Sequence, residues 1–377
     1  MARRILYLTG TRADFGLMQA TLQRIQATQG LQLQVAVTGT HLSPQHGHTV
    51  DEVRASGLAV LAEIPVDVLT RTGPSMALAI ADVTRGMTQL LERARPDALL
   101  LLGDRGEMLA GAIAALHVGV PVLHVHGGER SGTVDEPVRH AISKLASYHF
   151  AATQAARERL LKMGEPDGRI FVAGAPGLDG LQELAAMGRP ACLAAMGLPA
   201  GTDFVLALFH PVVQQAEQAA LQTQALLRAL RELALPVLWL EPNADAGSRG
   251  ILAALDGGEL PPGSRRLQHL PRAQFCAAMR HCAVMAGNSS SGIIEAASFG
   301  TPVVNIGSRQ HMREHGPNVV DAATEAEAIA AALRAQRGHG RWPCDNPWGD
   351  GHAGERIAQW LGVLPLGRTV LEKTNSY

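Results

Sequence analysis

The sequence predicts an α/β protein made of two Rossmann-like, doubly wound parallel-sheet domains with a central cleft. Short apolar runs rich in Val, Leu and Ile alternate with amphipathic stretches of 10 to about 20 residues. The apolar runs are continuous, which is typical of parallel strands covered on both faces. The alternation pauses once near the middle of the chain, at 178–202, where prolines and glycines gather, and then resumes.

The apolar runs and the stretches between them give the expected elements. In the first half we expect strands at 5–8, 33–37, 98–102, 122–125, 150–152 and 170–173, and helices at 15–27, 107–117 and 136–146. In the second half we expect strands at 205–209, 237–240, 283–286 and 303–306, and helices at 214–233, 273–280, 292–299 and 325–335. The expected domains are 1–177 and 203–350, joined by a connection at 178–202, with a C-terminal helix and tail at 351–377 that packs back on the first domain.

Composition limits the function. At ~150 residues per domain, 377 residues suggest about two domains. The chain has 33 Lys+Arg against 34 Asp+Glu, which argues against a general nucleic-acid binder or a polybasic membrane-surface protein. No apolar run reaches the roughly 18 residues that a membrane span needs. The four cysteines form no CxxC pair, so we expect a cytoplasmic protein without a disulfide framework or a cysteine zinc site.

Lysine is rare in this chain. The only lysines are Lys144, Lys162 and Lys373, and the other basic residues are arginines. This bias is interpreted as compositional and carries no functional inference by itself.

Polar motifs follow the expected strands, where ligands of doubly wound sheets bind. The segment TGTRAD at 9–14 places Arg12 at a helix start, where backbone N–H groups and a guanidinium favour phosphate. An ordinary strand–helix turn with a surface arginine explains it equally well. In the next motif, GDRGEM at 103–108, Asp104 and Arg105 are candidates for an ion pair. Alternatively Asp104 caps the following helix, with Glu107 completing a capping box.

The segment HVHGGE at 124–129 and the following loop are dense in acid–base groups. Strand alternation predicts that both histidines share one face, with His126 nearer the ligand. Glu129, Asp135 and Glu136 follow within the same loop region. Two histidines one residue apart can bind metal, but no third ligand has a recognisable spacing, so no metal site is expected.

The second half carries two further motifs. His210 ends its first strand and suits a phosphate, although a turn histidine is equally plausible. The more specific motif is GNSSSGIIE at 287–295, in which a strand, a loop of small residues and a helix follow one another. Glycine and serine allow a diphosphate to approach backbone N–H groups at the helix start. Glu295 is placed to accept hydrogen bonds from both ribose hydroxyls of a nucleotide.

Together, TGTRAD, GDRGEM, HGGE followed by TVDEPVRHAISK, and GNSSSG resemble the hydrolysing UDP-N-acetylglucosamine 2-epimerase family over nearly the whole chain. The resemblance implies the two-domain GT-B fold, with the first domain on the sugar and catalytic side and the second binding UDP. It implies an enzyme that expels UDP, inverts C2 and releases a free 2-acetamido-mannose sugar for sialic-acid-type synthesis. It also implies a homo-oligomer, a dimer or tetramer.

The resemblance also implies site residues. By motif match, the contacts to UDP or sugar are Arg12, Ala13, Arg105, His210, Asn243, His269, Ser289, Ser290, Gly292, Glu295 and Arg309. His210 is then a diphosphate contact, and His269 lies where the family holds the uracil edge. Asp104 and Asp135 match catalytic positions. Where well-described members hold a third catalytic carboxylate, this chain has His126, as some bacterial relatives do.

The chemistry that the resemblance implies makes its own demands. C2–H of the sugar has no adjacent carbonyl, so cleavage of the C1–O bond must run ahead of proton removal. Anti elimination of UDP gives a 2-acetamidoglucal, and water then adds at C1 while a proton returns to C2 from the other face. Two acid–base groups on opposite sides of C2 are expected. The candidates are Asp104, His126 and Asp135, with Glu129 and Glu136 in reserve; no metal or redox cofactor is needed.

Three other activities remain open at this point: a non-hydrolysing epimerase, a GT-B glycosyltransferase using a UDP-sugar donor, and a UDP-sugar-binding regulatory protein. The last would not need the carboxylates near His126. The sugar is also open between UDP-N-acetylglucosamine and UDP-N,N'-diacetylbacillosamine, which leads to legionaminic-type acids.

Overall fold

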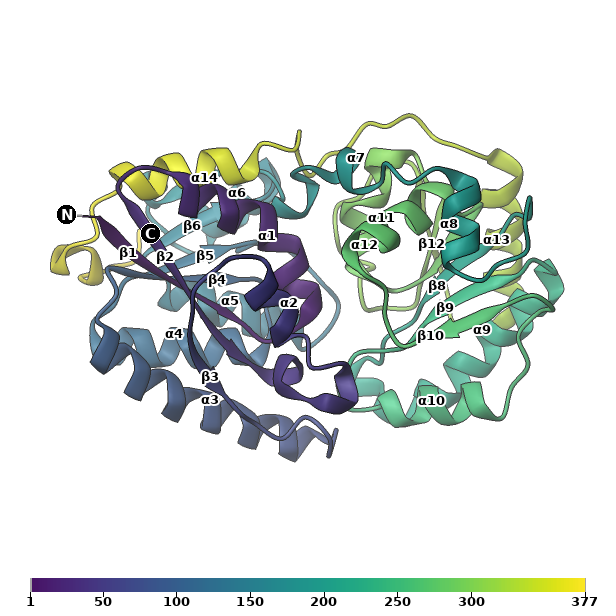
Figure 1. Cartoon of the computed structure of the whole chain (residues 1–377), viewed down its shortest axis with the longest axis horizontal. Helices are drawn as coiled ribbons and strands as arrows, with labels where there is room; N and C mark the ends of the chain where they lie inside the picture. The colour runs from purple at the N-terminus through teal and green to yellow at the C-terminus, as the bar shows by residue number, and fades with distance from the viewer. Residues whose placement is uncertain (1, 377) are drawn as a thin grey trace. The chain divides into compact units, whose positions relative to one another are not determined.

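The computed structural model describes residues 2–376, which divide into two compact units. Unit 1 comprises the described residues up to Arg130, Val134–Asp179 and those from Trp348 on. Unit 2 comprises Ser131–Thr133 and Gly180–Pro347. Each unit holds an all-parallel sheet with helices on its faces (Figure 1), which confirms the predicted α/β class.

The sheet of unit 1 has seven strands in the order β3-β2-β1-β4-β5-β6-β7. Its strands and helices, with the helix α14 that returns to it, are β1 (Arg3–Thr9), α1 (Arg12–Ala27), β2 (Leu31–Thr38), α2 (Val50–Ala55), β3 (Val60–Ile64), α3 (Gly73–Ala94), β4 (Ala98–Leu102), α4 (Gly106–Val118), β5 (Val122–Val125), α5 (Asp135–Leu145), β6 (Tyr148–Ala151), α6 (Gln154–Lys162), β7 (Ile170–Val172) and α14 (Ala353–Val363). The strand order reverses between β1 and β4, where ligands of such sheets bind.

The first strand of unit 1 is buried on both faces of the sheet. Ile5 and Tyr7 join an apolar cluster with residues of α1 and α14. Leu6 and Leu8 join a second cluster with residues of α3 and α4. Because successive side chains of a strand point to opposite faces, a continuous apolar run needs cover on both sides. The apolar runs therefore specify a sheet between two helical layers.

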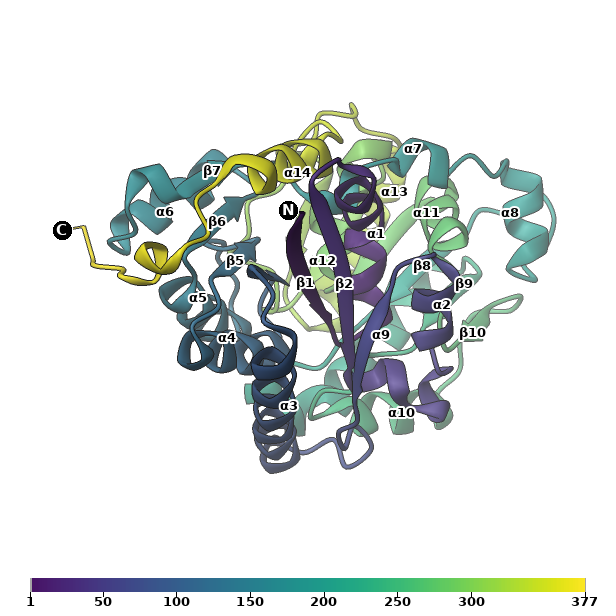
Figure 2. The same ribbon diagram turned by 60° about the vertical axis from the view of Figure 1, so that its left-hand side comes forward.

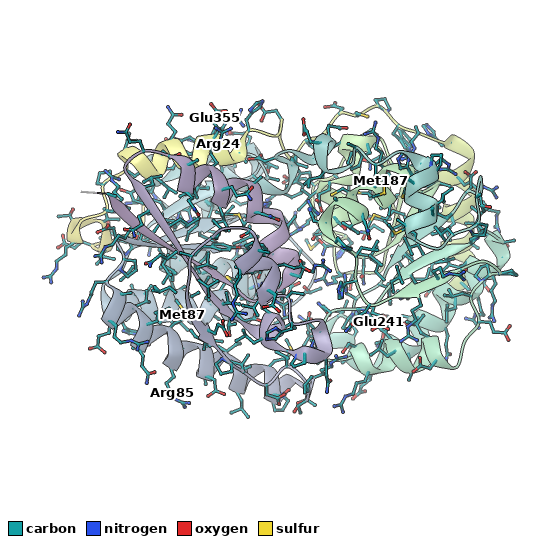
Figure 3. The ribbon with its side chains drawn as sticks, in the orientation of Figure 1. Arg24, Arg85, Met87, Met187, Glu241 and Glu355 are labelled. Atoms are coloured by element: carbon teal, nitrogen blue, oxygen red, sulfur yellow. The ribbon has the colours of Figure 1, made fainter. Side chains whose placement is uncertain are left out.

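Helix α3 has 22 residues and lies outside the helices expected from the sequence. Its buried positions, Val83, Met87, Leu90 and Leu91, follow helical spacing, but glycine and threonine between them weaken the pattern. Figure 3 shows Met87 in the interior of unit 1, whereas Arg85 on the same helix projects outward. A Cβ on Gly86 would lie 2.6 Å from Cγ2 of Ile64, so glycine here allows the helix to approach β3.

The C-terminal helix α14 packs against α1, and Figure 1 shows the yellow helix beside the purple one. Arg3 Nη1 donates to the carbonyl oxygen of Leu361 at 3.0 Å, which ties the end of α14 to the start of β1. A Cβ on Gly354 would lie 2.9 Å from Cα of Thr21 in α1. Glycine at this position thus permits the close approach of the two helices.

The sheet of unit 2 has six strands in the order β10-β9-β8-β11-β12-β13, with the order reversing between β8 and β11. Its elements are α7 (Leu181–Leu184), α8 (Arg189–Ala195), β8 (Val205–Leu208), α9 (Ala219–Leu233), β9 (Val237–Leu240), α10 (Ser248–Asp256), β10 (Arg265–Leu267), α11 (Arg272–His281), β11 (Val284–Gly287), α12 (Ser290–Ile294), β12 (Val303–Ile306), β13 (Val319–Ala322) and α13 (Ala326–His339). Val205, Ala207 and Phe209 form its core with residues of α9 and α13.

Two helices of unit 2 differ from those expected. The stretch 214–233 begins as a 3-10 segment (Val213–Gln218), and only Ala219–Leu233 is α-helical. The stretch 292–299 divides in the same way: α12 covers five residues, and Ala296–Phe299 follows as a 3-10 turn. Glu295 is the residue between these two turns. The helices predicted from the spacing of apolar residues were therefore longer than the α-helices in the structure.

Candidate active site

The loop after β1 is fixed by a buried carboxylate. Thr11 and Asp14 form a capping box at the start of α1, and Asp14 also accepts from the N–H of Gly10 at 3.0 Å. Burial raises the pKa of Asp14 to about 6, although hydrogen bonds from Thr9 and Gly10 oppose the shift. These bonds hold the backbone that presents Arg12, the first residue of α1.

Arg12 itself forms a two-point ion pair. Its Nε lies 2.9 Å from Oε2 of Glu52, and its Nη2 lies 2.7 Å from Oε1 of the same carboxylate. The remaining nitrogen, Nη1, is buried and has no hydrogen-bond partner among the residues that the structure describes. Arg12 is therefore held in place by both oxygens of Glu52. The neighbouring Ala13 is exposed.

Asp104 follows β4 and pairs with Arg139, which is fully buried on α5. The predicted capping box is wrong, because α4 begins at Gly106 with Arg105 as its N-cap and without a side-chain cap. Asp104 turns toward α5 instead. Arg105 lies beside Glu107, with 3.4 Å between Nε and Oε2.

Arg139 joins three parts of this edge of unit 1. Besides pairing with Asp104, it donates through Nη1 to the carbonyl oxygen of Glu129 at 3.0 Å. It therefore connects the loop after β4, the loop after β5 and helix α5. Arg139 lies within the TVDEPVRHAISK motif but was not among the predicted site residues, because nothing in a helical sequence distinguishes a buried arginine from a surface one.

His126 lies beyond the end of β5 with a φ of 64°, a conformation that is uncommon for a residue with a side chain. Strand alternation therefore does not extend to it, contrary to the sequence prediction. Its Nδ1 is hydrogen-bonded to Oε1 of Glu129, and both side chains are buried. The Trp348 ring lies 6.3 Å away at 31° between ring planes. Such backbone strain persists where surrounding structure fixes it, often at active sites.

The other histidine of this motif is part of the core. His124 is fully buried, its Nδ1 lies 3.1 Å from Ser143 Oγ, and its Nε2 lies 2.7 Å from the carbonyl oxygen of Gly103. Burial lowers its pKa to about 3. His124 thus remains neutral and links β5 to α5 and to the loop that carries Asp104.

Asp135 and Glu136 form the first turn of α5 and are half-buried. Glu136 Oε1 lies 3.6 Å from Nε2 of His140 one turn later. Unit 1 thus brings Asp104, His126, Glu129, Asp135 and Glu136 to the ends of β4 and β5 and to the start of α5. Asp135 and Arg139 lie on the same helix, and Arg139 pairs with Asp104. This ion pair therefore fixes Asp104 relative to Asp135.

In unit 2 the loops after β8 and β11 are joined by an amide. Asn288 accepts from the N–H of His210 at 2.7 Å and donates to the carbonyl oxygen of the same residue at 2.8 Å. A Cβ on Gly287, whose φ is 139°, would lie 1.8 Å from the carbonyl oxygen of Leu208, so only glycine fits. Asn288 lies inside the GNSSSG motif, but its role in fixing His210 was missed because it depends on a tertiary contact.

Further predicted residues lie around His210. The N–H of Asn243 donates to His210 Nδ1 at 3.2 Å, and Arg309 Nη1 donates to the carbonyl oxygen of Asn288 at 3.2 Å. Ser289 caps α12, and Ser290 is its half-buried first residue. The edge of unit 2 thus gathers backbone, amide, hydroxyl, imidazole and guanidinium groups that suit phosphate oxygens.

Gly292, Glu295 and His269 complete the predicted set. Gly292 is buried, and a Cβ there would lie 3.0 Å from Val303 Cγ1, so this residue brings α12 close to β12. Glu295 is 2% exposed and pairs with Arg272 at the start of α11, a partner that the sequence did not indicate. His269 lies exposed between β10 and α11.

Two features are not found within residues 2–376. No group of three or more His, Cys, Asp or Glu side chains there is arranged to hold a metal ion. Over the same residues, no helix has both the length and the apolar character to cross a bilayer.

Comparison with known proteins identifies the family. Residues 23–362 match the model of the family described as UDP-N-acetylglucosamine 2-epimerase. The chain is 44% identical over 377 residues to the UDP-N,N'-diacetylbacillosamine 2-epimerase (hydrolyzing) of Legionella pneumophila, covering 100% of both chains. It is 31% identical over 365 residues to the UDP-N-acetylglucosamine 2-epimerase of Neisseria meningitidis, covering 96% of this chain and 95% of that one.

Solved structures share the fold. The UDP-GlcNAc 2-epimerase of Neisseria meningitidis bound to UDP-GlcNAc superposes with a TM-score of 0.79 at 18% identity, covering 95% of this chain and 99% of that chain. The enzyme of Methanocaldococcus jannaschii in complex with UDP-GlcNAc and UDP gives a TM-score of 0.78 at 16% identity, covering 95% and 99%. With the family match and the full-length identity, this chain belongs to the UDP-N-acetylglucosamine 2-epimerase family.

Proposed function

We propose that this protein is a hydrolysing 2-epimerase, which converts a UDP-2-acetamido sugar into UDP and the free manno-configured sugar. The observation that carries the proposal is the arrangement of ionisable groups in unit 1, where His126 pairs with Glu129 and where Arg139 joins Asp104 to the loop of Glu129. The 44% identity over the whole chain to an enzyme named for this reaction supports it.

In this proposal, unit 2 holds the leaving group. His210, Ser289, Ser290 and Arg309 supply donors for the diphosphate, and the amide of Asn288 fixes the loop that presents His210. Donors that are already in place stabilise the negative charge that develops as the C1–O bond breaks. Glu295 accepts from the ribose hydroxyls, while Arg272 holds its carboxylate.

Unit 1 supplies the proton transfers. In the α-linked gluco sugar, H2 and the departing oxygen are both axial, so a base removes H2 as the C1–O electron pair leaves with UDP. The C2–H electron pair becomes the double bond of a 2-acetamidoglucal. Water then adds at C1, and an acid on the other face returns a proton to C2, which gives the manno configuration. Both steps need proton-transfer groups within hydrogen-bond reach of C2.

We assign the two proton-transfer roles to His126 and Asp135. Glu129 binds Nδ1 of His126 and therefore fixes the ring so that Nε2 can exchange a proton. Asp135 lies on the first turn of α5, where a carboxylate is favoured. Asp104 is paired with Arg139 and orients that arginine.

UDP-N,N'-diacetylbacillosamine is the proposed substrate, because the relative acting on it is 44% identical over the whole chain. UDP-N-acetylglucosamine is the second candidate, favoured by the 31% identity to the Neisseria meningitidis enzyme. The first substrate places the product in legionaminic acid synthesis and the second in sialic acid synthesis. A cytoplasmic location and a homo-oligomer are part of this proposal and rest on the sequence alone.

The deciding experiment incubates the purified protein with each UDP-sugar in turn. Free UDP and the free sugar should appear in equal amounts with the bacillosamine derivative, and more slowly with UDP-N-acetylglucosamine. A C2-inverted sugar still attached to UDP would instead identify a non-hydrolysing epimerase. UDP release only in the presence of a sugar acceptor would identify a glycosyltransferase.

A further inference from the structure

A buried carboxylate in unit 1 is surrounded by nitrogen atoms. Glu165 is 1% exposed, and its Oε1 lies 2.8 Å from Nζ of Lys144. Its Oε2 lies 2.9 Å from Nε2 of the buried His149 and 2.5 Å from Nζ of Lys373. Burial alone would raise the pKa of Glu165, but hydrogen bonds from His149, Lys144 and Lys373 outweigh it and lower the pKa to about 2. The carboxylate is therefore ionised.

Lys373 also binds the end of a helix. Its Nζ donates to the carbonyl oxygens of Ser143 at 3.0 Å, Lys144 at 3.0 Å and Ala146 at 2.8 Å. These carbonyls lie at the end of α5, which carries partial negative charge, and that of Ser143 also accepts from the N–H of Ala146 at 3.3 Å. With Glu165, four oxygen atoms from two segments thus surround one ammonium group.

The choice of residue is specific in a chain that otherwise uses arginine. Two of the three lysines, Lys144 and Lys373, bind Glu165, whereas Lys162 is exposed. A guanidinium is a planar fork, but a compact ammonium directs its donors in three dimensions. The four oxygen atoms around Lys373 Nζ therefore suit an ammonium better than a guanidinium.

The helix that Lys373 holds is also the one that carries the proposed chemistry. Asp135 is the first residue of α5, and Arg139 in its middle pairs with Asp104. Lys373 binds the last turn of the same helix, which is 11 residues long. Since an α-helix is a rigid rod over three turns, its position at one end determines its position at the other.

The segment that carries Lys373 is itself attached to unit 1. The carbonyl oxygen of Pro365 accepts from Tyr148 Oη at 3.0 Å, and that of Val370 accepts from Arg169 Nη1 at 2.8 Å. The N–H of Ser376 donates to the carbonyl oxygen of Gly164 at 2.8 Å. Figure 2 shows this yellow segment running beside α5 and α6 toward the C-terminus.

We propose that Lys373 is a positioning residue of the epimerase: it fixes the C-terminal end of α5 and thereby sets where Asp135 and Arg139 act on the sugar. The inference rests on the proposed function for its effect on turnover. It assigns the tail 364–376 a role in the reaction without contact to the substrate.

The test compares Lys373→Ala with Lys162→Ala, a matched control at the remaining, exposed lysine. In Lys373→Ala, kcat should fall about tenfold or more with KM changed by less than about twofold, because the reacting groups are displaced while the UDP contacts remain. n-Propylammonium, which replaces the deleted methylenes and ammonium, should restore kcat in a saturable manner. Tetramethylammonium, which has no N–H donor, should not. Lys162→Ala should keep wild-type kcat and respond to neither cation.

Hydrogen–deuterium exchange of the α5 amides gives a second readout that needs no turnover. Exchange should rise along α5 in Lys373→Ala and return toward wild type with n-propylammonium. Wild-type kcat in Lys373→Ala, or a loss that n-propylammonium does not reverse, would overturn the positioning role. If the wild-type protein releases no UDP, the proposed function fails, and unchanged exchange along α5 in the variant separately overturns the anchoring of that helix.

Discussion

In both sheets, candidate site residues follow the strands at which the strand order reverses. The two sets of residues present different chemistry. At the edge of unit 1, ionisable side chains are paired with one another: Arg12 with Glu52, Asp104 with Arg139 and His126 with Glu129. At the edge of unit 2, His210 and the loop after β11 are held mainly by the backbone and by the amide of Asn288.

This difference separates proton transfer from binding. Paired ionisable groups have fixed orientations and can exchange protons with a substrate at low reorganisation cost. Backbone and amide donors do not titrate, so they remain in place for the negative charge that develops on the diphosphate as the C1–O bond breaks. The comparison therefore predicts that variants of unit 1 alter turnover, whereas variants of unit 2 alter the affinity for UDP.

The largest effect is expected for Asp135→Asn. Sugar release should fall by about 10²–10⁴-fold, the range for loss of a general acid or base, while UDP still binds. A coupled assay of UDP release measures turnover, and calorimetry measures UDP affinity. The matched control is Asp82→Asn, which should behave as wild type. Asp82 forms an exposed ion pair with Arg85 on α3. Normal turnover by Asp135→Asn would remove this residue from the reaction.

The next effect is expected for Glu129→Gln. The amide lacks the negative charge that stabilises a protonated His126, so kcat should fall by about 10–100-fold with little change in KM. A variant with unchanged kcat would show that His126 acts without Glu129.

A smaller effect, on binding only, is expected for Glu295→Ala in unit 2. UDP affinity should weaken by about 1–3 kcal/mol, the scale for hydrogen bonds to a charged group. Glu232→Ala, which removes an exposed partner of Arg334, serves as the control. Unchanged UDP affinity by calorimetry would contradict the ribose contact, and a loss of kcat without a loss of affinity would contradict the division between the units.

The smallest effect is on stability. The pKa of Asp14 is raised from 3.8 to about 6, so its neutral form favours folding below pH 4 and this contribution is lost as pH rises through 6. As the pH rises from about 4 to about 6, the free energy of unfolding of Asp14→Asn should increase relative to that of the wild type by about 1 kcal/mol per pH unit. Urea unfolding at several pH values measures it. A constant difference between the two proteins would mean that Asp14 is already ionised at pH 4.

The sequence predicted strands such as β4 and β8, where an apolar run is continuous, but it missed β3 and β13. It missed helix α3 because glycine and threonine interrupt its apolar pattern, and it overextended α12 because local spacing does not show where a helix changes to a 3-10 turn. Short edge strands such as β10, in which two arginines precede a single leucine, carry too little apolar signal to be predicted.

Within the candidate site, motifs located the loops but not their partners. Arg139, Arg272 and Asn288 act through residues far away in sequence, so no local pattern indicates them. The capping box predicted for Asp104 was wrong for the same reason: a tertiary arginine competes with the helix N-terminus for the carboxylate. The left-handed backbone of His126 likewise depends on the surrounding loop.

The proposed elimination is tested most directly by turnover of UDP-N,N'-diacetylbacillosamine in deuterated water, followed by NMR. We expect one free UDP per sugar and one deuterium at C2 of a free manno-configured product, since a base removes H2 and the solvent supplies the deuteron that C2 receives. Release of UDP with protium retained at C2 would rule out the elimination, because the C2–H bond would never have been broken.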